Sequence, residues 1–69
     1  MELPDEVRRD VERAIVRWGE KMASRKRDDL EFEWRMFSNW LFGAEVILGL
    51  LGLEELARAA ADAQKETTK

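Results

Sequence analysis

The sequence predicts an all-α fold, a small three-helix bundle whose second helix is the apolar, central element. Three observations support this prediction. Apolar residues recur every three or four positions along most of the chain, the single proline stands at position 4, and the periodicity is interrupted only by the charged run "SRKRDDLE" and by the glycines near residue 50. Because the chain has 69 residues and no cysteine, we expect one domain over 1–69 that is stabilised by packing alone.

The first helix is expected over about residues 4–25. Pro4 suits the first turn of a helix, and Asp5 and Glu6 complement the positive end of the helix dipole. The apolar residues form one stripe, and most of the other positions are charged. The stripe consists of Val7, Val11, Ala14, Ile15, Trp18 and Met22. A stripe of this width is enough for contact with one neighbouring helix.

A tight turn is predicted where the charge changes sign. The basic run Arg25–Arg27 suits the carboxyl end of the first helix. Asp28 is followed three residues later by Glu31, which is the spacing of a capping box. We therefore expect the second helix to begin at about residue 29.

The second helix, over about 29–50, has two apolar seams. The first consists of Leu30, Trp34, Phe37, Leu41, Ala44, Leu48 and Leu51, and the second of Phe32, Met36, Asn39, Gly43, Val46 and Leu50. At about 100° per residue the seams lie roughly 150° apart, with Trp40 and Ile47 between them and Phe42 beyond the second. The strip expected to face solvent carries Glu31, Ser38, Glu45 and Gly49. The apolar arc of roughly 280° exceeds what two neighbouring helices cover.

Gly49 or Gly52 is expected to end this helix in the left-handed conformation, with Leu53 packing back on it. The third helix is expected over about 53–65. Glu54 and Glu55 stand at its dipole-favourable end, and its inner face is mostly alanine. Residues 66–69 are expected to fray.

Composition excludes several functional classes. The chain has no histidine and no cysteine, so Cys/His metal sites, haem ligation and histidine- or cysteine-based catalysis are not available. We expect no catalytic residue, no metal and no cofactor. The 12 basic and 15 acidic residues give a net charge of -3, which argues against nucleic acid as a partner.

The sequence also argues against a membrane setting. Residues 36–53 form an apolar run of 18 residues with one charge, at the lower limit for a spanning helix. Glu45 near its middle and the polar pair Ser38 and Asn39 argue against insertion. The acidic amino-terminal segment does not read as a signal peptide. The expected localisation is cytoplasmic, as a soluble protein.

The second seam is the predicted partner-binding site. It is rich in large apolar side chains around a glycine, which is the composition of an interface centre. The predicted partner-binding residues are Phe32, Arg35, Met36, Asn39, Phe42, Gly43, Val46 and Leu50. The expected function is a non-catalytic protein-binding module. Two alternatives are a homodimer formed through the same face and a third helix that covers the seam completely.

The chain resembles a de novo designed three-helix mini-binder in style. The resemblance rests on charge-crowded helix surfaces such as "PDEVRRDVERAIVRWGEK" and "LEELARAAADAQKE", two short turns and one aromatic-rich helix. It implies a rigid scaffold that presents one helix face to a protein target, expressed in a bacterial cytoplasm and without a cofactor. Gly19, Gly43 and Gly49 inside predicted helices depart from the style. They suit a natural phage or bacterial inhibitor or adaptor protein.

Overall fold

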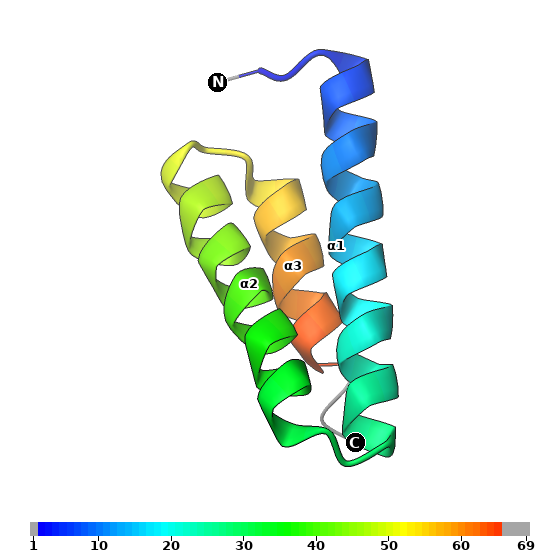
Figure 1. The fold of residues 1–69 in the computed structure, drawn as a ribbon. Helices are drawn as coiled ribbons and strands as arrows, with labels where there is room; N and C mark the ends of the chain where they lie inside the picture. Colours follow the sequence, from blue (N-terminus) through cyan, green and yellow to red (C-terminus); the bar gives the residue numbers. More distant parts are fainter. Residues whose placement is uncertain (1, 66–69) are drawn as a thin grey trace.

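The computed structural model describes residues 2–65, so the predicted frayed tail at 66–69 lies outside the described residues. The described chain forms α1 (Asp5–Arg27), α2 (Glu31–Leu50) and α3 (Glu54–Lys65), joined by two short turns (Figure 1). The predicted all-α, three-helix architecture is confirmed. Each helix packs against the other two, and α2 has more extensive contact with α1 and with α3 than these have with each other.

The core lies between the three helices and is formed by one side of each. Its buried residues are Ile15, Met22, Phe37, Leu41, Leu48, Leu53, Leu56 and Ala60. Leu41 is completely buried at the middle of α2. Its position matches the first seam predicted for the second helix, because residues three, four and seven positions apart fall on the same side of an α-helix.

The turn between α1 and α2 differs from the predicted capping box. The amide of Asp28 still donates to the Ser24 carbonyl (3.1 Å), so α1 extends to Arg27 and Asp28 closes it. Asp29 then adopts a left-handed φ of 60°, and the Leu30 amide donates back to the Arg25 carbonyl (2.9 Å). Leu30 is the residue before α2, and no side chain caps that helix. The capping-box prediction was wrong because the backbone itself closes the turn.

The turn between α2 and α3 has the same form. Gly52, with φ of 78°, donates its amide to the Gly49 carbonyl (3.1 Å). The Leu53 amide donates to the Leu48 carbonyl (2.9 Å), and both leucine side chains are buried. This is the Schellman arrangement, with its apolar contact between the residue after the turn and the last helical turn. Of the two predicted glycines, Gly52 ends α2, and Gly49 lies inside it.

Aromatic side chains join α1 to α2. The Trp18 ring meets the Trp40 ring edge-on, with centroids 5.6 Å apart, and Phe37 meets Trp40 at 5.2 Å. Near the first turn, the Lys26 ammonium lies 5.3 Å from the centre of the Trp34 ring. These contacts hold the inner side of Trp40 against α1, and they fix which side of α2 remains free.

On its other side α2 meets α3, and here a second prediction was wrong in part. Of the strip expected to face solvent, Glu31 and Gly49 are exposed, whereas Ser38 and Glu45 are half-buried. The Gln64 amide donates to a Glu45 carboxylate oxygen (2.9 Å) and to the Ala60 carbonyl (3.2 Å). The Gln64 amide gives the half-buried Glu45 carboxylate a polar partner, which offsets the cost of its partial burial beside α3. Since α3 packs here, it does not lie over the second seam.

Candidate functional site

Within residues 2–65, one side of α2 is not covered by the other helices or turns. We call it the outer face, and it consists of Phe32, Asn39, Trp40, Phe42, Gly43, Val46, Ile47 and Leu50. Phe32 and Leu50, near its two ends, are each 83% exposed. Phe42 and Ile47 are each 59% exposed, and Trp40 and Val46 are a little under half exposed. The apolar residues of α2 therefore extend well beyond those that form the core.

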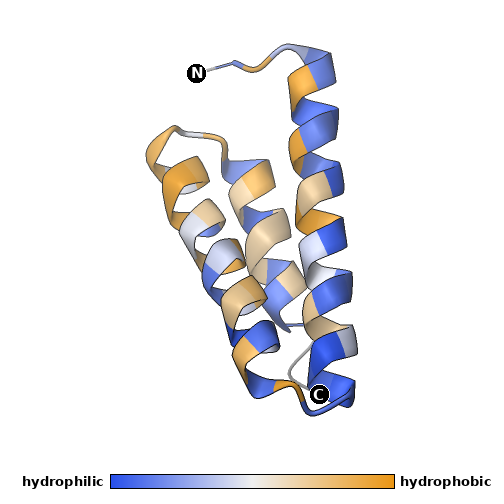
Figure 2. Ribbon diagram, viewed as in Figure 1, coloured by the Kyte–Doolittle hydropathy of each residue, from blue (hydrophilic) through white to orange (hydrophobic). Residues whose placement is uncertain are grey.

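The outer face follows from the sequence of α2. Phe37, Leu41 and Leu48 point into the core from one side of the helix. At about 100° per residue, Phe32 and Leu50 lie on the opposite side. Figure 2 shows hydrophobic residues along α2, most densely at the end that leads into α3, whereas α1 carries many more hydrophilic positions. The sequence places apolar residues on both sides of one helix, and the bundle covers only one side.

The exposed apolar area is large for a chain of this size. At roughly 200 Å² per aromatic side chain, the exposed parts of Phe32, Trp40 and Phe42 alone come to roughly 370 Å². With Val46, Ile47 and Leu50 the outer face reaches on the order of 600 Å². Patches beyond a few hundred Å² are rare on monomers unless they bind something.

The structure places most of the predicted site residues on this face. Phe32, Asn39, Phe42, Val46 and Leu50 are exposed, and Gly43 is half-buried at their centre. Their role in binding stays a prediction.

The other two predicted residues lie at the borders. Met36 is half-buried and packs against the core. Arg35 is exposed and forms an ion pair with Glu31, with a guanidinium nitrogen 2.7 Å from a carboxylate oxygen. Only part of the Met36 side chain is therefore available to a partner, and Arg35 forms a charged margin.

Two members of the outer face, Trp40 and Ile47, were not among the predicted site residues. Trp40 keeps nearly half of its surface exposed although one side packs on Trp18 and Phe37. Ile47 is more exposed than Val46. The signal was available, because both residues lie between the two seams on the side that α3 does not cover. It could be used only once the position of α3 was known.

The glycines of α2 have no packing role within residues 2–65. A Cβ atom added to Gly43 or to Gly49 would meet no atom within 4 Å apart from neighbouring atoms of its own helix. By contrast, a Cβ atom on Gly19 would lie 3.2 Å from that of Ala63, so Gly19 allows α1 and α3 to approach. Glycine inside a helix costs up to about 1 kcal/mol relative to alanine. Gly19 has an internal reason for this cost, and Gly43 does not.

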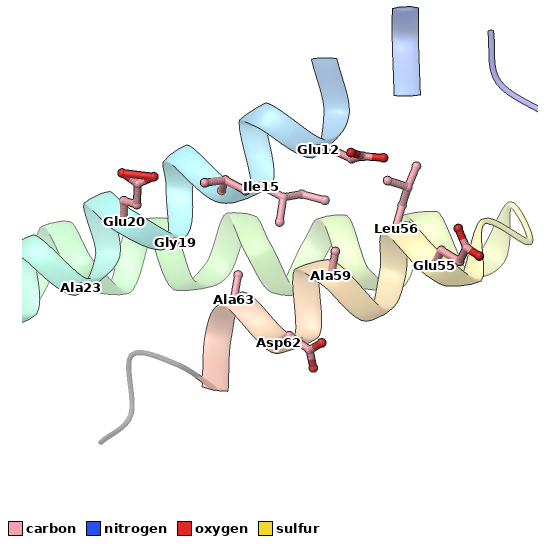
Figure 3. Close-up of a pocket in the computed structure, with 11 residues that line it drawn as sticks. Glu12, Ile15, Gly19, Glu20, Ala23, Glu55, Leu56, Ala59, Asp62 and Ala63 are labelled. Carbon is pink, nitrogen blue, oxygen red and sulfur yellow. The ribbon is translucent and has the colours of Figure 1, made fainter. Parts of the chain in front are cut away.

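A second concave region lies between α1 and α3. This groove of about 540 Å³ has a floor of small or aliphatic residues, including Ile15, Gly19 and Ala63. Its rim carries four carboxylates (Figure 3), and one of them, on Glu55, pairs with Arg8 at 3.5 Å. Among the described residues that line the groove, none carries a hydroxyl, thiol, amine or imidazole. Over residues 2–65, no group of three or more possible ligands among His, Cys, Asp and Glu could hold a metal ion.

Comparison of the chain with protein-family models, with curated proteins and with solved structures gave no match. Within the part of the chain that the structure describes, none of the helices is long and apolar enough to cross a membrane.

Proposed function

We propose that the chain is a non-catalytic protein-binding module that docks the outer face of α2 on another polypeptide. The observation that supports this most strongly is the exposure of Phe32 and Leu50, 83% each, at the two ends of the outer face. Exposing this surface to water is unfavourable, and covering it with a partner removes the cost.

The area is sufficient for specific binding. At about 25 cal/mol per Å², burying on the order of 600 Å² of apolar surface contributes roughly 15 kcal/mol before the costs of association. Those costs are about 4 to 15 kcal/mol. The remainder allows affinities from weak to nanomolar, depending on how well the partner packs around the aromatic side chains.

The proposal includes the absence of catalysis. The chain has no histidine and no cysteine, and the reactive groups that line the groove between α1 and α3 are carboxylates. Compact helices with charged surfaces and short turns support a scaffold of the designed mini-binder type. Idealised designs avoid glycine inside a helix unless packing requires it. Gly43 and Gly49 have no such packing reason, and they therefore support the alternative, a natural small inhibitor or adaptor protein. In both cases the outer face is the docking surface.

The proposal can be tested with a displayed library of amphipathic helices selected for binding to the wild-type chain. Selected helices are then measured against Phe42→Glu, which places a charge on the outer face. The matched control is Val16→Glu on α1, where the valine is 57% exposed beside the groove with α3. Circular dichroism melts of both variants verify that the fold is kept.

We expect most selected helices to lose at least about tenfold in affinity for Phe42→Glu and to bind Val16→Glu normally, because a buried unpaired charge is costly at an interface. If most of them bind Phe42→Glu as well as wild type, the outer face is not the docking surface.

A further inference from the structure

We infer that the partner that best fits the outer face is a second copy of this chain, with the two α2 helices antiparallel and the two-fold axis at the level of Leu41. This inference rests on the proposed function and adds the identity and the orientation of the partner. Three features of the outer face support it: the spacing of its residues, the open space at its centre and the charges at its ends.

The spacing of the second seam, whose members except Met36 lie on the outer face, reads the same in both directions. Positions 32, 36, 39, 43, 46 and 50 are separated by four, three, four, three and four residues. Spacing of this kind keeps one seam of a helix against another helix. An antiparallel two-fold operation maps position 32 onto 50, 36 onto 46 and 39 onto 43. Each pair at the ends then joins two apolar residues, and a self-complementary surface is what a two-fold interface requires.

The centre of the seam combines a polar residue with an empty position. In the antiparallel register Asn39 of each copy lies opposite Gly43 of the other. Gly43 has no atom within 4 Å of an added Cβ apart from its own helix, and Asn39 is exposed. The glycine leaves space in which the facing asparagine fits and lets the helices approach closely. A single polar residue on an apolar seam also specifies register at some cost in stability.

The ends of α2 favour the antiparallel orientation. Helix α2 carries Glu31 and Glu33 in its first turn and no basic residue in its last turn. A parallel pair would place both acidic ends side by side. In the antiparallel pair Arg35 of one copy comes level with Ile47 of the other, in the last turn of that α2 helix. A cation there complements the helix dipole.

The area is of the order that a stable dimer needs. Trp40 and Phe42 flank the centre on its two sides, and in this register each lies near its own symmetry mate. With on the order of 600 Å² of apolar surface from each copy, the pair buries on the order of 1,200 Å², the lower limit of standard stable interfaces. Aromatic side chains near the middle are the residues that contribute most at such interfaces.

The register can be tested by disulfide trapping, because the chain contains no cysteine of its own. Phe32→Cys and Leu50→Cys variants are mixed in equal amounts and oxidised. The two positions are 18 residues apart, or roughly 27 Å along α2. A disulfide between position 32 of one copy and position 50 of the other therefore cannot form in a parallel pair. The antiparallel pair predicts mainly mixed 32–50 links. Predominantly 32–32 and 50–50 links show a parallel pair and overturn the inference.

Sedimentation equilibrium of the wild-type chain over a wide concentration range supplies the second measurement. We expect a monomer–dimer equilibrium that Phe42→Glu abolishes and Val16→Glu leaves unchanged. Gly43→Leu is expected to weaken the dimer roughly ten- to a hundredfold by overpacking the seam, with no fall in the melting temperature of the dilute monomer.

The outcomes separate this inference from the proposed function. If the wild type is a monomer at all concentrations but helices selected from the library still need Phe42, self-pairing is wrong and the docking face stands. If the wild type is a dimer and Phe42→Glu does not weaken it, self-pairing through the outer face is wrong. The library selection alone then decides whether the outer face binds another polypeptide.

Discussion

Two phenylalanines on α2 test how the bundle divides that helix between core and surface. Phe37 is 7% exposed and packs edge-on against Trp40, whereas Phe32, five residues earlier, is 83% exposed. Phe37→Ala should cost about 3 to 5 kcal/mol, because it removes a buried ring and leaves a cavity. Phe32→Ala should change the free energy of unfolding by less than about 0.5 kcal/mol, because little buried surface is lost and alanine favours the helix.

These magnitudes matter for a chain of this size. At roughly 0.05 to 0.15 kcal/mol per residue, the whole domain is stable by about 3 to 10 kcal/mol. Phe37→Ala therefore removes a large part of the total, and the variant should be partly unfolded without denaturant at the low end of that range. Phe32→Ala should unfold at the same urea concentration as wild type.

The assay is urea denaturation followed by far-ultraviolet circular dichroism in dilute solution, so that self-association does not contribute. Equal slopes against urea indicate that the variants unfold from equally compact states. A loss above about 1.5 kcal/mol for Phe32→Ala, or below about 1 kcal/mol for Phe37→Ala, contradicts the division of α2 that the structure shows.

Four further substitutions, each at a single backbone position, are measured by urea denaturation of the dilute monomer. Asp29→Gly should raise stability by about 0.5 to 1 kcal/mol and Gly52→Ala should lower it by about 1 kcal/mol, because both positions are left-handed; unchanged midpoints would show that neither turn is strained. Gly19→Val should lower stability by about 1 to 3 kcal/mol through its clash with Ala63, and a neutral result would mean that α1 and α3 separate freely. Gly43→Ala should raise it by about 0.5 to 1 kcal/mol, since the added methyl meets only solvent; a loss would show that the outer face is covered in the monomer.

The fold could be predicted from the spacing of the apolar residues, because those on the core side of α1 and α2 recur at helical intervals in the sequence. Ile15 and Met22 on α1 and Phe37, Leu41 and Leu48 on α2 lie at positions that periodicity assigns to one side. The second turn could also be predicted, since Gly52 is the residue type that the left-handed position requires.

The packing of α3 could not be predicted from the same information. Glu45 and Ser38 suggested a strip facing solvent, and nothing in their spacing shows that Gln64, nineteen residues beyond Glu45, donates to its carboxylate. At the first turn, Asp28 has the residue type and spacing of a cap. Whether α1 continues through that position depends on backbone hydrogen bonds, which side-chain patterns do not report.

The candidate site was predicted from the angular positions of residues around α2. The errors in that prediction have the same origin. The excess of apolar circumference on α2 placed Phe32, Phe42 and Leu50 outside the core, and the structure exposes all three. Its borders depended on where α1 and α3 lie. Ile47 was therefore left out, and Met36, which packs partly on the core, was included.

Hydroxyl-radical footprinting of the aromatic and aliphatic side chains of α2, read by mass spectrometry over a dilution series, tests most directly whether this helix keeps a surface for a partner. In dilute monomer we expect Phe32, Phe42 and Leu50 to react readily while Phe37 and Leu41 stay protected. Raising the protein concentration, or adding a helix selected from the library, should then protect Phe32, Phe42 and Leu50. Protection of Phe32, Phe42 and Leu50 to the level of Phe37 in the dilute monomer would contradict the existence of an uncovered docking face.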